Sequence, residues 1–187
     1  MTDLNVLLAV ADGSEDMETV ITLDVLRRAG LAVTLTSVMP QRQITCAHGT
    51  QLRADALMAD VLSKSWDAIV LPGGMPGAEY LSDCTALINM LREQDKAGKT
   101  VAAICASPAV VLAKHGLLKG KQAVAYPGFE QGLAQGEAIL VEQAVVQDGH
   151  VITSRGPSTA MLFALQIIKH LCGEEKATQV AKGLLLA

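Results

Sequence analysis

Two kinds of hydrophobic pattern alternate along this chain. One is a short, nearly unbroken apolar run, which is typical of a strand covered on both faces of a sheet. The other is a longer stretch with helix start and stop signals. The predicted strands span 4–10, 32–38, 67–71, 100–104 and 122–126, with further strands in 144–153 and two short ones within 41–56.

The stretches between these strands predict helices. Ser14 is expected to cap the first helix, because Glu15, Asp16 and Glu18 then fall in the first turn, where the helix dipole favours acids. The predicted helices span 14–28, 83–97, 107–115 and 157–171, and a last one begins at 174. Strands that alternate with helices predict βαβ units, a mostly parallel sheet and an α/β fold. The length, 187 residues, fits one domain, 1–187.

Composition narrows the classes of partner. The net charge is −4, no basic run is present and aromatic residues make up 3%, so nucleic acid is not an expected partner. No apolar stretch is long enough to span a membrane, and the N-terminus lacks a signal-peptide pattern. Four scattered cysteines without a CxxC pair predict neither a zinc site nor a disulfide framework. We therefore expect a cytoplasmic protein with reduced thiols.

Cys105 is the strongest candidate for chemistry. It follows the predicted strand 100–104 directly, and a helix is predicted to start at Ser107. Its small neighbours suit a nucleophile elbow, a tight turn that lifts a side chain above the sheet. A helix N-terminus also favours the thiolate. The alternative is a buried core cysteine, since cysteine is among the most buried residue types.

Two further segments end near the same edge of the predicted sheet. Glu18 lies just past the first strand, so it could exchange a proton with Cys105, although spacing alone favours dipole compensation as the role of this acid. Gly73 and Gly74 follow the strand 67–71 and could present N–H groups to an oxyanion. Taken alone, the two glycines are better explained by a plain turn.

Arg155 opens the segment between the last strand and the helix 157–171. It could hold an anionic group or brace loops through carbonyl oxygens, and the sequence does not decide between these roles.

Three other cysteines lack the position of Cys105 and are interpreted as packing residues or mildly exposed thiols: Cys46, Cys84 and Cys172.

Taken together, the motifs resemble the ThiJ/PfpI superfamily. The motifs are Glu-Asp-Met-Glu-Thr-Val, Val-Leu-Pro-Gly-Gly, Ala-Ala-Ile-Cys-Ala and Thr-Ser-Arg-Gly-Pro, and their order and spacing extend the likeness over essentially the whole chain. Within the superfamily, the chain is similar to the deglycase branch associated with Parkinson disease, which has YajL-like bacterial members.

The resemblance implies a flavodoxin-like three-layer sandwich and a homodimer. It implies that Cys105 is the reactive cysteine, that Glu18 is its carboxyl partner, and that the N–H groups of Gly74 and Ala106 point at the sulfur or an oxyanion. Peptidase-like members have histidine after the cysteine, where this chain has Ala106, so protease activity is not expected. Tyr126 stands where several relatives have a pocket histidine, and His48 where relatives often have arginine.

Two hypotheses follow from the resemblance. In the first, the chain is a cofactor-free, metal-free glyoxalase or deglycase that acts on methylglyoxal, glyoxal or early glycation adducts on protein, using Cys105 and Glu18. In the second, it is a non-enzymatic redox sensor and chaperone whose Cys105 oxidises to sulfinic acid. Both need an accessible thiol beside a carboxyl group, so the sequence does not separate them.

Overall fold

A seven-stranded sheet forms the centre of the molecule in the computed structural model, which describes residues 4–186. The strands lie in the order β10-β11-β7-β6-β1-β2-β5, and only β10 runs antiparallel to its neighbour. Their bounds are β1 Asn5–Val10, β2 Ala32–Ser37, β5 Ala56–Leu57, β6 Ala68–Leu71, β7 Thr100–Ile104, β10 Val145–Asp148 and β11 Val151–Ser154. Two small sheets pair β3 Gln43–Thr45 with β4 Gln51–Arg53, and β8 Gln122–Ala123 with β9 Ile139–Leu140.

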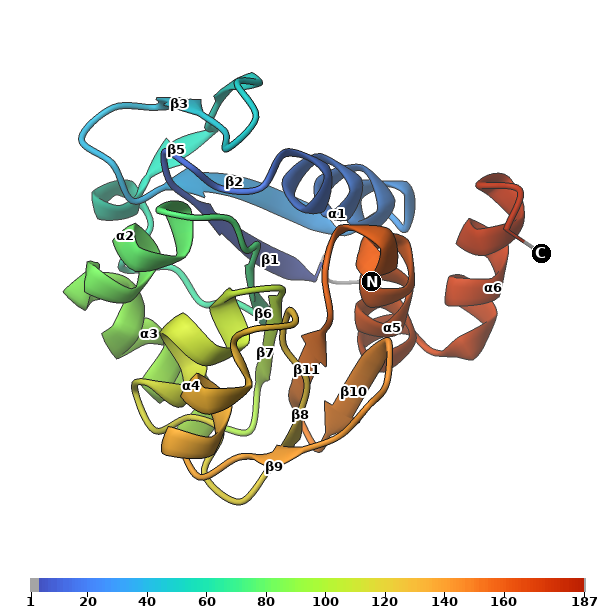
Figure 1. The fold of residues 1–187 in the computed structure, drawn as a ribbon. Coiled ribbons are helices and arrows are strands. Elements are labelled where there is room, and N and C mark those ends of the chain that lie inside the picture. Colours follow the sequence, from blue (N-terminus) through green and yellow to red (C-terminus); the bar gives the residue numbers. More distant parts are fainter. Residues whose placement is uncertain (1–3, 187) are drawn as a thin grey trace.

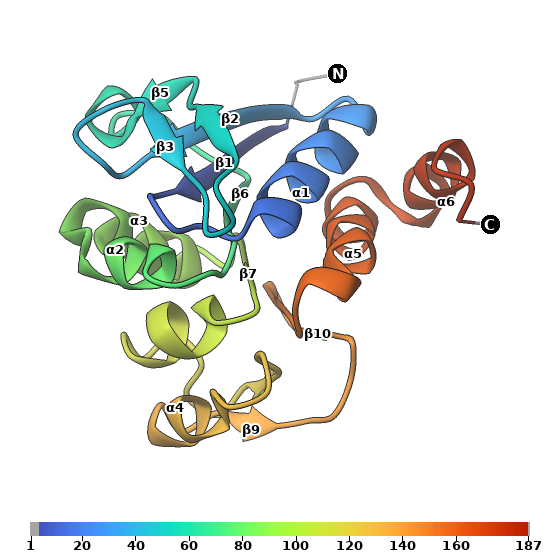
Figure 2. The ribbon, with the colours of Figure 1, turned by 45° about the horizontal axis from the view of Figure 1, so that its top comes forward.

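Helices cover both faces of this sheet (Figures 1 and 2). Helices α1 and α5 pack on one face, whereas α2 and α3 cover the other. The α-helices are α1 Asp16–Arg28, α2 Gly77–Asp83, α3 Thr85–Lys96, α4 Glu130–Gln135, α5 Ala160–Cys172 and α6 Glu174–Gly183. The predicted flavodoxin-like three-layer sandwich with a mostly parallel sheet is confirmed. No helix within 4–186 is both long and apolar enough to cross a bilayer.

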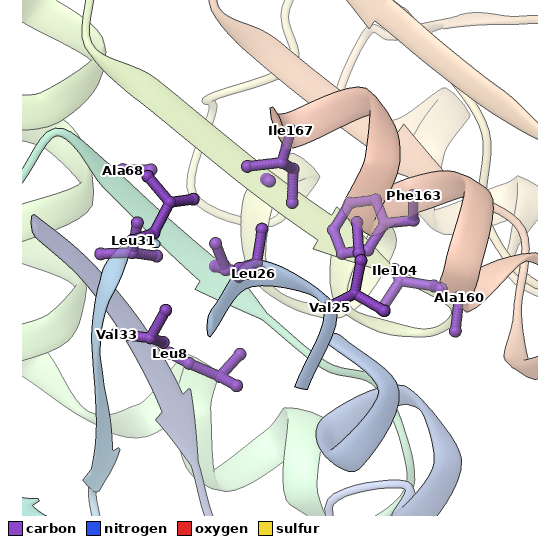
Figure 3. Packing of buried hydrophobic residues seen from close by; sticks show 14 of the residues in the cluster. Leu8, Val25, Leu26, Leu31, Val33, Ala68, Ile104, Ala160, Phe163 and Ile167 are labelled. Atoms are coloured by element: carbon purple, nitrogen blue, oxygen red, sulfur yellow. The ribbon is translucent and has the colours of Figure 1, made fainter. Parts of the chain in front are cut away.

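The central strands are apolar throughout because they are buried on both faces. In β1, Val6 and Leu8 join the cluster beneath α1 and α5, whereas Leu7 and Ala9 join the cluster beneath α2 and α3. Figure 3 shows Phe163 of α5 packed near Ile104 at the end of β7. Burial of such a side chain contributes about 1.5–3 kcal/mol. The cluster beneath α1 and α5 therefore holds the end of β7 in place, and Cys105 follows directly after that strand.

Several predicted elements were wrong in detail. Glu15, not Ser14, is the N-cap of α1, because the Glu15 carboxylate accepts from the Glu18 N–H, while Ser14 Oγ accepts from Ala11. The predicted helix 83–97 is α3 alone, and a separate helix, α2, precedes it. After Cys105, the chain forms a π-helix, Pro108–Ala113. The predicted strand 122–126 shrinks to β8, and α4 was not predicted.

Candidate active site

Three neighbouring strands bring the candidate residues together. Strands β7, β6 and β1 are adjacent and parallel, so their carboxyl ends meet at one edge of the sheet (Figure 1). Cys105 follows β7, Gly73 and Gly74 follow β6, and Glu18 lies in the first turn of α1 after β1. The sheet order, rather than nearness in sequence, makes these groups neighbours.

Cys105 has the backbone of a nucleophile elbow. Its φ is 66°, in the left-handed region that residues with a side chain rarely adopt. Two hydrogen bonds hold this conformation: the Cys105 N–H donates to the Ser154 carbonyl, and the Tyr126 N–H donates to the Cys105 carbonyl, both at 2.9 Å. Such strain at a side chain poised for chemistry is common in functional sites. The strained turn is thus supported by β11 on one side and by segment 124–127 on the other.

Glu18 is a fully buried acid whose carboxyl group faces the thiol. Its Oε2 accepts from the Gly73 N–H at 2.7 Å, and the Cys105 thiol hydrogen-bonds to the same carboxyl group. Its Oε1 is buried and has no partner among residues 4–186. A buried carboxyl with one oxygen free keeps a position at which a proton can be held.

Glu15 positions Glu18. The Glu15 carboxylate accepts from the Glu18 N–H at 2.7 Å, and the Glu15 N–H donates to the Gly73 carbonyl at 3.0 Å. These bonds tie the start of α1 to the loop after β6. Sequence reasoning assigned Glu15 only to dipole compensation. Its place three residues before Glu18 was the available signal, because an N-cap side chain accepts from an N–H two or three residues later.

The electrostatics of the pair differ from the expectation of a thiol with a depressed pKa. Burial raises the pKa of Glu18 to about 7. Burial, followed by repulsion from the Glu18 carboxylate, raises the pKa of Cys105 to about 12, and the N–H groups of Gly74 and Ala106 oppose this shift. Near neutral pH the negative charge of the pair therefore resides on Glu18. The Cys105 thiol keeps its proton until the sulfur attacks a substrate.

Close packing explains the glycines beside the sulfur. A methyl group on Gly73 would lie 2.5 Å from Cys105 Cβ and 2.9 Å from Glu18 Oε2. Gly74 has a φ of +86°, and a methyl group there would lie 2.4 Å from the Glu15 nitrogen. The N–H groups of Gly74 and Ala106 both act on the Cys105 sulfur. The structure thus places Gly73, Gly74 and Ala106 around Cys105, in an arrangement that can stabilise a developing anion.

Tyr126 and Arg155 lie at the rim of this arrangement. Tyr126 is 45% exposed, and its ring lies against Gly156, where a methyl group would be 3.0 Å from Tyr126 Cδ2. Arg155 is exposed, and within 4–186 its side chain makes no hydrogen bond or ion pair with Cys105, Glu18 or another residue. The site therefore brings five predicted residues together and leaves these two outside.

One group of side chains has the spacing of a cation site. Ligand atoms of Glu15, Asp16 and His48 lie within 4.8 Å of one another. The two carboxylates already accept hydrogen bonds from the backbone. Glu15 accepts from the Glu18 N–H, and Asp16 accepts from the N–H groups of His48 and Thr50. These hydrogen bonds give both acids a structural role. Glu15 stabilises the start of α1, and Asp16 links α1 to the turn between β3 and β4.

Comparison with known proteins places this geometry in a family. The DJ-1/PfpI family profile matches residues 4–170. The chain is 45% identical to Protein DJ-1 homolog A of Arabidopsis thaliana over 97% of its own length and 46% of that protein's length. It is 37% identical to the glutathione-independent glyoxalase DJR-1.2 of Caenorhabditis elegans, over 97% of this chain and 95% of that protein. The structure of oxidised Toxoplasma gondii DJ-1 superposes with a TM-score of 0.94 at 43% identity, covering 98% of this chain and 99% of that one.

Proposed function

This chain belongs to the DJ-1/PfpI family, and on that premise we propose that it is a cysteine-dependent glyoxalase and deglycase. Its substrates are methylglyoxal, glyoxal and their early adducts on protein amines, and its role is protection against carbonyl and oxidative stress. The named glyoxalase activity of the Caenorhabditis elegans relative supports the reaction class.

The observation that carries this proposal is the pairing of Cys105 with Glu18. An efficient general acid and base has a pKa near the working pH. Burial gives Glu18 a pKa of about 7, and its carboxyl group is hydrogen-bonded to the Cys105 thiol. Glu18 can therefore accept the thiol proton at the moment of attack and return it later, which a permanently charged acid would do poorly.

In the first step, the Cys105 sulfur attacks the aldehyde carbon of methylglyoxal while Glu18 accepts the thiol proton. A carbon–sulfur bond forms, and the carbonyl π electrons move to the oxygen, which then takes the proton from Glu18 to give a hemithioacetal. The N–H groups of Gly74 and Ala106, which act on the sulfur, stabilise the transient negative charge.

In the second step, the Glu18 carboxylate removes the hydrogen from the former aldehyde carbon, and an enediolate forms. Protonated Glu18 then delivers that proton to the neighbouring carbon, which leaves a lactoyl thioester on Cys105. Water, deprotonated by Glu18, attacks the thioester, the carbon–sulfur bond breaks, and the proton returns to the thiol. The sum is methylglyoxal plus water to lactate, with one carbon oxidised and its neighbour reduced.

Deglycation reaches the same hemithioacetal from a hemiaminal adduct. The Cys105 sulfur forms a bond to the carbon that carries the amine, the carbon–nitrogen bond breaks, the free amine leaves, and the hemithioacetal continues through the second step to lactate. Glu18 supplies the proton that the departing nitrogen needs. Each step relies on groups that the chain itself contributes.

The test is direct formation of lactate from methylglyoxal by metal-free, glutathione-free protein. We expect lactate from the native chain and none above background from Cys105→Ser, while Cys46→Ser, which alters another buried cysteine, should retain turnover. Absence of lactate from the native chain would reject the glyoxalase proposal. Release of free amine from a methylglyoxal–amine adduct, with the same variants, tests the deglycase branch separately.

A second candidate function is a redox sensor with chaperone activity. The N–H groups of Gly74 and Ala106 can also stabilise the negative charge of a sulfinate formed on Cys105. The solved Toxoplasma relative is described as oxidised, which supports oxidation chemistry in this family. Under this alternative, peroxide converts Cys105 to sulfinate without any need for turnover of aldehyde.

We further propose a cytoplasmic homodimer. Helices α1 and α5 pack against each other and carry exposed large apolar side chains, Met17 and Val20 on α1 and Met161 and Leu162 on α5. Exposed apolar side chains on paired helices suit a subunit interface. Four free cysteines within 4–186 fit a reducing compartment. Sedimentation showing a monomer at micromolar concentration would contradict the dimer.

A further inference from the structure

A cavity of about 230 Å³ lies next to the candidate active site and has no part in the chemistry described above. Its lining combines buried apolar residues with the charged side chains of Arg155, Glu142 and Glu130, which are exposed. The remaining walls come from Ala123, Val124, Ala125, Pro127, Leu133, Leu140 and Val141.

The cavity exists because two strands separate. The β8–β9 ladder pairs Gln122 with Ile139 and Ala123 with Leu140, and the Val141 N–H then donates to the Ala123 carbonyl. Beyond that bond, segment 124–126 turns to other partners: the Val124 N–H donates to Thr153 Oγ1, and the Tyr126 N–H donates to the Cys105 carbonyl. The cavity lies in the resulting fork.

The same bonds connect the cavity to the reactive cysteine. Ala125, in the cavity wall, precedes the residue that binds the Cys105 carbonyl, and Arg155 follows Ser154, which binds the Cys105 N–H. Tyr126 follows Ala125 of the cavity wall, and its half-exposed ring lies against Gly156, the residue after Arg155. The same two backbone segments, 123–127 and 154–156, therefore hold both the reactive cysteine and the cavity.

Two opposite charges at the mouth remain unpaired. Arg155 and Glu142 line one small cavity, yet neither forms an ion pair or a side-chain hydrogen bond with the other or with any residue in 4–186. Glu130 differs, because its carboxylate already accepts from the Gly128 N–H at 2.7 Å. The free pair offers a guanidinium for a carboxylate and a carboxylate for an ammonium group.

From this arrangement we propose that the cavity binds the α-carboxylate and α-ammonium groups of a free lysine whose side-chain amine carries the aldehyde adduct. Arg155 binds the carboxylate, Glu142 binds the ammonium group, and the aliphatic stem crosses the Tyr126 ring so that the adduct carbon reaches Cys105. This inference rests on the proposed deglycase function and adds to it a substrate class, adducts of free amino acids.

Other ligands fit the cavity less well. A simple anion would face the uncompensated Glu142, a simple cation would face Arg155, and an apolar molecule would leave both charges without a partner. The volume is below the usual 300–1,000 Å³ of sites for drug-sized ligands, so it suits a group of only a few atoms.

The experiment measures binding rather than turnover, using calorimetry on the full chain with Cys105→Ser to prevent chemistry. The probes are L-lysine, Nα-acetyl-L-lysine, which lacks the ammonium charge, and L-lysinamide, which lacks the carboxylate. We expect lysine to bind and each derivative to bind about 10- to 100-fold more weakly, as expected when a charged hydrogen-bond partner is lost. Equal affinity for all three probes, or no binding of lysine at millimolar concentration, would overturn the proposal.

Matched variants assign each charge. Arg155→Gln should bind lysine and lysinamide alike, and Glu142→Gln should bind lysine and Nα-acetyl-lysine alike. Arg53→Gln, which removes another exposed arginine without an ion pair, should keep the full discrimination. Discrimination that survives in Arg155→Gln and Glu142→Gln would overturn the assignment. Because these measurements need no catalysis, failure of the lactate assay and failure of this cavity proposal are distinguishable.

Discussion

Cys105 and Cys46 are similarly buried, 8% and 4% exposed, yet their surroundings prepare them for different roles. Burial raises the pKa of both thiols, to about 12 for Cys105 and to about 11 for Cys46. Glu18 and two N–H donors act on Cys105, whereas the charges nearest Cys46 are carboxylates, Asp16 first among them. Burial alone therefore does not distinguish a nucleophile from a packing cysteine.

The acids beside the two sulfurs explain the contrast. Burial raises the pKa of Glu18 to about 7, so this acid exchanges protons at neutral pH. Burial acts in the same direction on Asp16, but hydrogen bonds from Thr50 and His48 outweigh it and keep the pKa of Asp16 below its ordinary value. Asp16 therefore stays ionised and is a poor proton acceptor for Cys46. A base that titrates near the working pH is what separates the two sites.

The largest expected effect is that of removing this base. Glu18→Gln should lower methylglyoxal turnover about 10²- to 10⁴-fold, because the general acid and base is lost. The same change should lower the Cys105 pKa, since the repelling carboxylate is gone. Alkylation of Cys105 by iodoacetamide at pH 7 should therefore become faster while turnover collapses.

Asp16→Asn is the matched control for that variant, since it changes a neighbouring acid in the first turn of α1. Asp16→Asn should keep turnover within about a factor of a few, because the Asp16 carboxylate accepts from the N–H groups of His48 and Thr50 and not from the groups around Cys105. If Glu18→Gln turned over aldehyde like Asp16→Asn, the mechanism would be wrong and the redox-sensor function would be favoured.

Oxidation offers a second contrast between the two cysteines. Mild peroxide should convert Cys105 to sulfinate, which the N–H groups of Gly74 and Ala106 stabilise, while Cys46 remains largely reduced. We expect at least about a tenfold difference in the fraction modified, because Glu18 can accept the Cys105 thiol proton and two N–H groups act on its sulfur, whereas carboxylates alone act on Cys46. Mass spectrometry of peptides containing each cysteine measures it. Equal oxidation, or a Cys105 disulfide as the main product, would contradict this expectation.

A smaller effect is expected from the glycine packed beneath the sulfur. In Gly73→Ala, the added methyl group would lie 2.5 Å from Cys105 Cβ, so the unfolding free energy should fall by about 1–3 kcal/mol. Gly183→Ala is the control, because the space around Gly183 in α6 is open and alanine favours a helix. Denaturant titration compares the two. A Gly73→Ala protein as stable as the native chain would show that the cysteine is not held this tightly.

The buried acid should also make stability depend on pH. Its folded pKa, about 7, lies above its ordinary value of 4.5, so the folded state binds the proton more tightly than the unfolded state. The favourable contribution is complete below pH 4.5 and is lost as the pH rises through 7. Relative to Glu18→Gln, the native chain should lose on the order of 3 kcal/mol between pH 4.5 and pH 8. An identical pH dependence of both proteins would contradict the raised pKa.

Much of the fold could be predicted because the sheet is covered on both faces. Strands β1, β6 and β7 are buried along nearly their whole length, and their apolar runs identify them. Helix α4 escaped prediction because it is short and contains Gly132, with Gly136 as its C-cap. Both glycines allow close approach to the π-helix, since a methyl group on Gly136 would lie 2.6 Å from Ala113 Cβ. A tertiary contact, not a local preference, sets those positions.

Only part of the candidate site could be predicted from the sequence. Strand ends point to Cys105, Glu18 and the two glycines, because parallel strands end at a common edge. The thiol pKa was mispredicted because the favourable helix N-terminus is visible in the sequence, whereas burial and the charge on Glu18 are not. Nor did spacing show that Glu15 holds Glu18, or that Arg155 faces a cavity instead of Cys105. These features depend on depth and side-chain direction, which sequence spacing does not contain.

The pH profile of kcat/KM for methylglyoxal tests most directly whether Glu18 is the base that activates Cys105. Glu18 must be ionised to accept the thiol proton, and its pKa is about 7. The rate should therefore rise between pH 6 and pH 8 with a midpoint near 7 and then level off. A rate that stays flat across this range, or that keeps rising beyond pH 9 with ionisation of the free thiol, would contradict the account.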